Sequence, residues 1–365
     1  MKHNEVVSSG QVASLFLAFM TGSSIINIPG TVVGLARQGA WISLLLSSAC
    51  GGLLLAFVLF LHRRHPARTW IEMSRESLGA VVTFIVCLPF LVYLFLMMTW
   101  IIIDIGGFFT LTMMPETPVY IFNLPIIIIS ALTVRAGIEV MCRMFKLLLY
   151  IMIFFAVAVL IMSLPNYHPE YLLPIIHTGW KPILHGAYYT FGFPYAEVVI
   201  FSMLLVYRRR GDKSRLGLHM ARAYLINVLL LMTAIVCTIM AFGPVAVDLK
   251  YSLFQIARLI SIGDFIERVE SVIGISLILG SYMKATIALF VLNLALSQIA
   301  RLRNGRILIM VIAMASFALT LIMFKHQADF AEKVSEVWPL INLFGGIAPL
   351  FLLVGAVYVK RMITK

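Results

Sequence analysis

The chain has 365 residues, of which 61% are hydrophobic and only 12% are charged, and its mean hydropathy is +1.00. A water-soluble domain could not bury so much apolar surface, so this composition predicts an all-α integral membrane protein. The formal net charge of +12 would suit a nucleic-acid partner. Because Lys and Arg gather in alternate loops between apolar segments, we attribute that charge to membrane topology and expect no nucleic-acid partner.

The distribution of basic residues also predicts the orientation of the chain. Most of the 28 Lys and Arg residues fall in loops on one side of the expected spans. The positive-inside rule places that side in the cytosol. Both termini then lie in the cytosol, which requires an even number of spans.

Motifs of catalytic and metal sites are missing from the sequence. The chain has no HExxH, GxSxG or P-loop spacing. Its four cysteines are scattered and form no CxxC pair: Cys50, Cys87, Cys142 and Cys237. We therefore expect no enzyme, no metal site, no cofactor and no disulfide framework.

Apolar runs separated by Gly, Pro and charged residues predict about ten transmembrane helices in a single domain, residues 1–365. The expected spans are 10–36, 40–62, 80–113, 119–134, 143–163, 184–207, 218–243, 266–297, 307–324 and 337–359. Between the seventh and eighth spans, the apolar pattern that begins at Leu253 predicts a short helix over the outer mouth of the bundle.

Two of these spans carry residues that interrupt a helix. The first span contains Gly22, Ser23, Ser24, Asn27 and a Pro-Gly pair between residues 20 and 30, and the sixth contains Gly and Pro between residues 190 and 197. Backbone groups freed at membrane depth must face protein, water or a ligand. Broken helices in corresponding positions of two halves indicate a binding site at the interface of an inverted repeat. We therefore predict a 5+5 arrangement, with repeats at about 10–163 and 184–359.

The ends of half-helices suggest which ligand could bind. Their N-termini favour an anion such as a carboxylate, and unwound carbonyls can accept hydrogen bonds from an ammonium group. An amino acid carries both groups. The ligand-binding residues predicted at the two breaks are Thr21, Gly22, Ser23, Ser24, Phe191, Gly192, Phe193, Tyr195 and Glu197. The alternative for the small residues is close helix packing, and the alternative for Glu197 is a bond to freed backbone N–H groups.

The third span presents a stripe of side chains on one helical face, at spacings of three and four. Its members are Tyr93, Met97, Trp100, Asp104 and Phe108. An acidic residue within a span should face protein or water, so the stripe is expected to look into the bundle. We predict that Tyr93 and Met97 line the pocket, whereas Trp100 and Phe108 are expected to serve in packing.

Lys284 lies near the middle of the eighth span, beside Met283, which is also assigned to the pocket. A lysine there is costly unless it is paired, hydrated or neutral. The hypothesis is that its ammonium group occupies the place of a coupling cation and either fixes the first broken helix or carries a proton. The alternative is that Lys284 extends to a membrane interface. Lys146 is a second candidate for the ion or proton site, with a role as a cytosolic anchor as its alternative.

Three segments of the sequence resemble the B subunits of bacterial endospore germinant receptors, the spore germination permease branch of the amino acid–polyamine–organocation superfamily. They are Met20-Thr21-Gly22-Ser23-Ser24, the break from Phe191 to Glu197 with the following Val198-Val199-Ile200-Phe201, and Phe265-Ile266-Glu267-Arg268-Val269-Glu270-Ser271. The resemblance covers essentially the whole chain.

This resemblance implies a LeuT-like fold in the inner membrane of a spore and a nutrient, commonly an amino acid, that binds between the broken helices and spans three and eight. It also implies partners, namely an A subunit and a lipoprotein C subunit. Lys284 differs from the small polar residue that the resemblance leads us to expect. The alternative function is a proton-coupled amino-acid transporter that works alone. A third possibility is a structural membrane scaffold.

Overall fold

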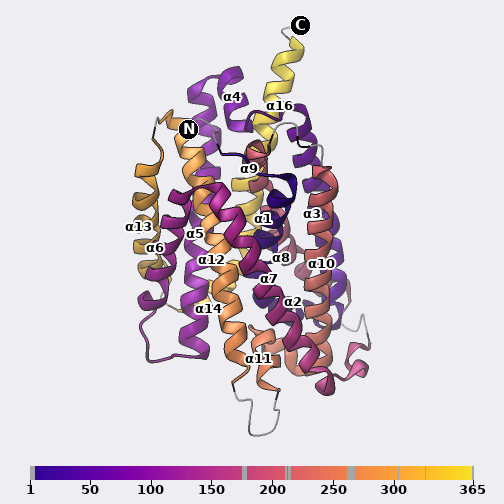
Figure 1. Cartoon of the computed structure of the whole chain (residues 1–365). Helices are drawn as coiled ribbons and strands as arrows, with labels where there is room; N and C mark the ends of the chain where they lie inside the picture. Colours follow the sequence, from indigo (N-terminus) through magenta and orange to yellow (C-terminus); the bar gives the residue numbers. More distant parts are fainter. Residues whose placement is uncertain are drawn as a thin grey trace.

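The structure of the chain is a computed structural model that describes residues 5–174, 179–209, 212, 215–260, 268–302, 304–324 and 326–363. Within these ranges every named element is a helix, and one isolated bridge pairs Val7 with Arg208. In Figure 1 the two ends of the chain lie at the same end of the bundle, and α11 lies at the opposite end.

The α-helices of the first half, in chain order, are α1 (Ser9–Thr21), α2 (Ser24–Ala36), α3 (Ala40–Arg64), α4 (Trp70–Leu78), α5 (Ala80–Thr112), α6 (Tyr120–Ala136) and α7 (Ile138–Met162). Those of the second half are α8 (Trp180–Thr190), α9 (Phe201–Leu204), α10 (Leu216–Phe242), α11 (Ser252–Arg258), α12 (Glu270–Ala300), α13 (Arg306–Ile322), α14 (Gln327–Glu336), α15 (Trp338–Ile341) and α16 (Ala348–Ile363). Two π-helical turns, η4 (Phe191–Tyr195) and η8 (Asn342–Ile347), and three 3₁₀ segments, η5 (Ala196–Ile200), η6 (Leu205–Tyr207) and η7 (Gly243–Asp248), bear on the site.

Seven helical segments of the described chain are long and apolar enough to cross a membrane, or eight if the bent pair α13–α14 forms one span. The count differs from ten for two reasons. The run Ser24–Arg64 joins α2 and α3 through a short 3₁₀ turn, and Ser9–Thr21 and Tyr120–Ala136 are shorter apolar helices. Each of the ten expected spans is present as a helical segment, and the chain is an all-helical integral membrane protein.

Some boundaries and two helices differ from expectation. α7 begins at Ile138, earlier than the predicted residue 143. Helices α4 and α14 were not predicted, because both are too polar to register as spans. α4 is instead defined by a capping box between Thr69 and Glu72. The expected outer helix is α11, and residues 261–267, which include part of the Phe265–Ser271 motif, lie outside the described residues.

The first break is shorter than the sequence suggests. Only Gly22 and Ser23 lie between α1 and α2, whereas Asn27 and Pro29 belong to α2. Side chains satisfy the carbonyls near the break: Ser24 Oγ donates to Met20 O at 2.5 Å, and Asn27 Nδ2 donates to Ser23 O at 3.0 Å. These bonds keep the interruption compact, because short polar side chains can replace lost backbone partners.

The second break extends over more residues. α8 ends at Thr190 and continues as the π turn η4, in which Phe193 has the extended values φ −141° and ψ 111°. The 3₁₀ segment η5 then leads into α9. The last span contains a π-helical turn, η8, that continues α15 into α16, and Asn342 Nδ2 donates to Trp338 O there at 3.0 Å.

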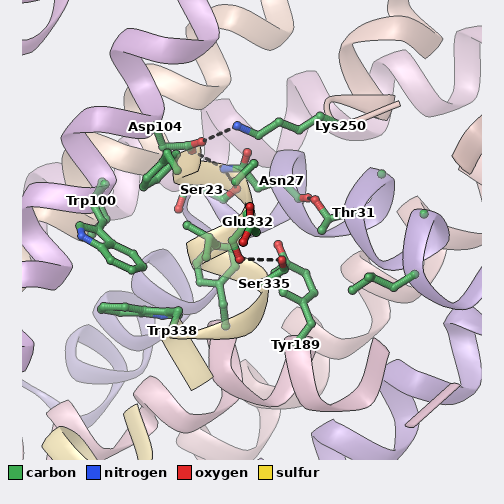
Figure 2. A pocket seen from close by; sticks show the side chains of 18 of the residues that line it. Ser23, Asn27, Thr31, Trp100, Asp104, Tyr189, Lys250, Glu332, Ser335 and Trp338 are labelled. Atoms are coloured by element: carbon green, nitrogen blue, oxygen red, sulfur yellow. Dashed lines mark hydrogen bonds and ion pairs between the residues drawn. The ribbon is translucent and has the colours of Figure 1, made fainter. Parts of the chain in front are cut away.

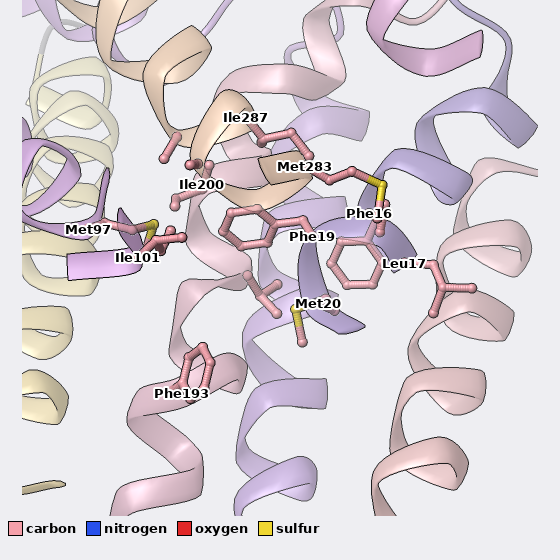
Figure 3. Close-up of a cluster of buried hydrophobic side chains, with 14 of the residues drawn as sticks. Phe16, Leu17, Phe19, Met20, Met97, Ile101, Phe193, Ile200, Met283 and Ile287 are labelled. Atoms are coloured by element: carbon pink, nitrogen blue, oxygen red, sulfur yellow. The ribbon is translucent and has the colours of Figure 1, made fainter. Parts of the chain in front are cut away.

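The two central segments are the most buried spans. In the most apolar part of α12, 83% of residues are buried, and for the segment Trp180–Tyr207 the value is 78%, against 33–44% for the other spans. Figure 3 shows side chains from both broken spans, α5 and α12 in one apolar cluster that includes Phe19, Met97, Phe193 and Met283. The broken sixth span and α12 therefore lie in the middle of the bundle, and the other spans contribute most of its exposed surface.

Candidate functional site

A cavity of about 420 Å³ lies where the two broken spans meet α5 and α12. One face of α2 supplies residues at helical spacing, and η7 with its following residues and α14 complete the wall. The lining comprises Ser23, Asn27, Gly30, Thr31, Gly34, Leu35, Met97, Trp100, Ile101, Asp104, Tyr189, Phe193, Glu197, Val247, Asp248, Leu249, Lys250, Lys284, Phe330, Ala331, Glu332, Val334, Ser335 and Trp338. The volume is in the range of ligand pockets.

A buried ion pair joins α12 to the break of the sixth span. Lys284 Nζ lies 2.5 Å from Glu197 Oε2, and the two side chains are 0% and 2% exposed. The indole N–H of Trp338 donates to the other oxygen of Glu197 at 3.1 Å. The ammonium group also lies 3.9 Å from the ring centre of Phe193. Lys284 is therefore paired inside the bundle and does not extend to a membrane interface.

A second ion pair lies at the α5 wall of the cavity (Figure 2). Asp104 Oδ2 accepts a bond of 2.6 Å from Asn27 Nδ2, and Asp104 Oδ1 accepts one of 3.4 Å from the Tyr251 hydroxyl. Lys250 Nζ lies 3.8 Å from Asp104 Oδ1 and 4.8 Å from the ring centre of Tyr251. Burial lowers the pKa of Lys250, and the carboxylate of Asp104 partly opposes that effect.

The segment that carries Lys250 packs on α2 through glycines. A Cβ on Gly30 would lie 2.1 Å from Leu249 O and 2.4 Å from Lys250 O, and one on Gly34 would lie 3.0 Å from Val247 O. Residues 247–250 thus contact the second half of the first broken span directly. Together with the Asp104–Lys250 pair, this contact holds the segment at the edge of the cavity.

Aromatic rings form another part of the wall. The ring centres of Trp100 and Trp338 lie 5.0 Å apart with their planes 37° apart, and Phe330 meets Trp100 edge to face at 5.8 Å. In Figure 2, Trp100 and Trp338 lie on one side and Tyr189 on the other. The cavity therefore combines two paired charges with an aromatic wall.

Five of the predicted site residues line this cavity: Ser23, Met97, Phe193, Glu197 and Lys284. Three others form the first break instead. Thr21 Oγ1 accepts a bond of 3.1 Å from Asn227 Nδ2, and Ser24 binds carbonyls of α1. Gly22 crosses α12 at Gly280, where a Cβ on Gly22 would lie 2.7 Å from Gly280 O.

The other predicted residues pack around the cavity or lie away from it. Tyr93 stacks on Trp338 at 5.6 Å, and Tyr195 packs against Tyr224 at 5.6 Å. Gly192 contacts Pro339, and Met283 belongs to the apolar cluster of Figure 3. Phe191 is half-buried and outside the lining. Lys146 is exposed, with its ammonium group 6.0 Å from the ring centre of Tyr150, and does not reach the cavity.

Several lining residues were missed or assigned to packing. Trp100 lines the cavity whereas Tyr93 lies behind Trp338, the reverse of the expected order on the same helical face. Asn27 and Thr31 share the face of α2 with Ser23, a spacing that could have identified them. The residues of α14 had no comparable signal, because nothing in the sequence indicates that a polar helix folds back onto the cavity.

Comparisons with known proteins agree with this architecture. The model of the family described as "Spore germination protein" matches residues 6–330. The chain is 25% identical to spore germination protein KB of Bacillus subtilis (strain 168), over 97% of this chain and 95% of the relative. It is 24% identical to spore germination protein XB of Bacillus anthracis, over 89% of this chain and 90% of the relative.

Two solved transporter structures have a similar fold. One is MHP1, a nucleobase-cation-symport-1 family transporter solved with bromovinylhydantoin. It matches this chain with a TM-score of 0.68 at 13% identity, and the alignment covers 98% of this chain and 94% of the MHP1 chain. MhsT in complex with L-phenylalanine has a TM-score of 0.66 at 14% identity and covers 98% of each chain. These likenesses establish a LeuT-like fold. Because the family model spans most of the sequence and the relatives align along nearly the whole length, the chain belongs to the spore germination protein family.

Proposed function

We propose that this protein is the B subunit of a germinant receptor and that it senses a nutrient, an amino acid, in the cavity between its broken spans. The observation that carries the proposal is the placement of the Lys284–Glu197 pair in the wall of a cavity built from both breaks. An amino acid has the same two charged groups as this pair. Its carboxylate can compete for Lys284, and its ammonium group can compete for Glu197 or for Asp104, the acidic residue of the second ion pair in the wall.

The proposed mechanism is a shift between two arrangements of the bundle. The cavity wall includes residues from the first and sixth spans and from α5 and α12, so a bound ligand contacts all four. A ligand that contacts one arrangement better than the other changes their populations by its difference in affinity. An A subunit and a lipoprotein C subunit would respond to that change. We place this assembly in the inner membrane of the spore, with both termini of this chain in the cytosol.

Binding to the purified full-length protein tests the proposal. A mixture of L-amino acids should raise the midpoint of heat unfolding, because a ligand at 100 times its Kd stabilises the folded state by about 2.7 kcal/mol. The Lys284→Met variant should lose this response. A folded wild-type protein that no amino acid stabilises would rule the proposal out.

The alternative, a proton-coupled transporter that works alone, is favoured by the buried Lys284–Glu197 pair, since paired acidic and basic groups inside membranes mark proton pathways. Uptake distinguishes the two functions. Proteoliposomes that hold this chain alone are mixed with labelled amino acids, with and without a pH gradient. A sensor subunit binds the ligand without accumulating it, whereas uptake driven by the gradient would establish the transporter.

A further inference from the structure

We infer that the ligand of this cavity carries a planar ring and has no net charge, as an aromatic amino acid does. This inference rests on the proposed function, which supplies the ligand, and it adds the ligand's size and chemical class. It is carried by the aromatic wall, by the balance of charge in the cavity and by buried polar atoms that lack a hydrogen-bond partner.

The size of the cavity and its rings favour a large ligand. Five aromatic residues contribute to the wall around about 420 Å³, namely Trp100, Tyr189, Phe193, Phe330 and Trp338. A small aliphatic amino acid would leave most of this volume to water. A planar ring can pack against Trp100 and Trp338, and aromatic pairs gain affinity beyond the area they bury.

The charges of the wall disfavour a ligand with net charge. Glu197 is paired with Lys284 and bonded by Trp338, and Asp104 is bonded by Asn27 and lies near Lys250. The remaining acidic residues of the lining are exposed: Asp248 and Glu332. Because a buried charge without a partner is costly, a ligand whose own charges cancel fits this wall best.

Two uncharged polar atoms of the lining are buried without a hydrogen-bond partner, Asn27 Oδ1 and Trp100 Nε1, and the first of them bears on the ligand's amine. The amide nitrogen of Asn27 donates to Ser23 O and to Asp104 Oδ2, and both of these atoms are acceptors. This assigns the orientation of the amide and leaves Asn27 Oδ1 as an acceptor without a bond, in a residue only 7% exposed. A donor on the ligand, such as an ammonium group, would satisfy it. The ligand's amine is then expected near Asn27 and Asp104, with its ring toward Trp100.

Titration of the full-length protein with separate ligands tests this inference. The probes are L-alanine, L-leucine, L-phenylalanine and L-tryptophan, with affinity measured by calorimetry. We expect the two ring-bearing ligands to bind about tenfold more tightly than L-alanine, a difference of about 1.4 kcal/mol. Trp100→Ala should remove this preference, and Trp100→Phe should restore most of it. The matched control is Trp180→Ala, because Trp180 is 57% exposed and outside the cavity.

The outcomes separate this inference from the proposed function. If L-alanine or L-leucine binds most tightly, the ligand class is wrong and the sensing function stands. If Trp100→Ala weakens all four ligands equally while Trp100→Phe does not rescue ring binding, the aromatic wall does not select the ligand and the inference fails. If none of the four binds to folded wild-type protein, both the ligand class and the proposed amino-acid sensing fail.

Discussion

Lys284 and Glu197 form a buried ion pair in which each charge offsets the desolvation cost of the other. Removing one partner of a buried pair costs about 3–5 kcal/mol, because the remaining charge is left alone, whereas removing both is often neutral. We therefore expect Lys284→Met and Glu197→Gln each to lower the midpoint of heat unfolding strongly, and the double variant Lys284→Met/Glu197→Gln to recover most of the loss. Lys146→Met is the matched control, because Lys146 is exposed and should change stability by less than about 0.5 kcal/mol.

The double variant has a second use. It restores a stable bundle without the two charges, so it separates folding from ligand recognition. We expect it to show no stabilisation by amino acids. If the double variant loses as much stability as the two single variants together, the pair contributes no coupling free energy. That result would contradict the 2.5 Å contact between Lys284 Nζ and Glu197 Oε2.

Asp104 connects the first broken span to the segment at the edge of the cavity. Its carboxylate accepts a bond from Asn27 on α2 and pairs with Lys250. The substitution Asp104→Asn removes the charge that attracts Lys250, and we expect residues 247–250 to leave the cavity edge more often. The measurement is the rate at which an impermeant maleimide labels a Ser23→Cys variant, in a background where the exposed Cys50 is replaced by Ala.

We expect Asp104→Asn to increase that labelling rate. Glu332→Gln is the control, because Glu332 lines the cavity but is exposed and pairs with Lys333 at 3.5 Å. A rate that is the same in the wild type and in Asp104→Asn would show that the ion pair does not restrict access to Ser23.

At the scale of elements, the contact between α12 and the first break depends on two glycines. A Cβ on Gly280 would lie 2.3 Å from Gly22 O, and the atoms it meets belong to the backbone and cannot rotate away. Gly280→Ala should therefore force the break away from α12 and destabilise the protein by about 1–3 kcal/mol. In Gly355→Ala, by contrast, the new Cβ meets nothing within 4 Å.

Because Gly355 lies in α16, its replacement by Ala should leave stability unchanged or raise it slightly, since Ala favours helix over Gly. Both variants are compared with the wild type by heat unfolding and by ligand binding. If Gly280→Ala and Gly355→Ala change the stability by the same amount, α12 and the first break can separate without a cost in free energy.

The elements also show what the sequence could predict. Both main breaks were visible, because Gly22-Ser23 and the Gly and Pro of residues 191–195 interrupt apolar runs. The sequence predicts that Lys284 is buried, because it is a charged residue inside an apolar span. It does not predict that Glu197 is its partner, because that pairing depends on how the sixth span crosses α12. Tyr93 and Trp100 share one helical face, and their roles differ because Tyr93 packs against Trp338, Gly345 and Gly346.

At the scale of the whole molecule, an N-terminal strap formed by residues 5–9 joins three elements at the end of the bundle opposite α11 (Figure 1). Val7 N donates to Tyr207 O at the end of the sixth span, and Arg209 N donates to Val7 O. Glu5 Oε2 accepts a bond of 2.7 Å from Ile138 N, the first residue of α7. A carboxylate at a helix N-terminus is favourable both as an acceptor and as a negative charge.

The strap links both broken spans to α7, so any rearrangement that separates these elements at that end must break it. We expect Glu5→Gln to weaken the link and to raise the rate of hydrogen exchange at the amides of Val7 and Ile138. It should also change ligand affinity, because the strap would then favour one of the two arrangements between which the ligand selects. Gln11→Ala, which removes part of the capping box of α1, is the control for simple loss of local stability. Faster exchange with unchanged affinity in Glu5→Gln would show that the strap holds this end of the bundle without coupling it to the cavity.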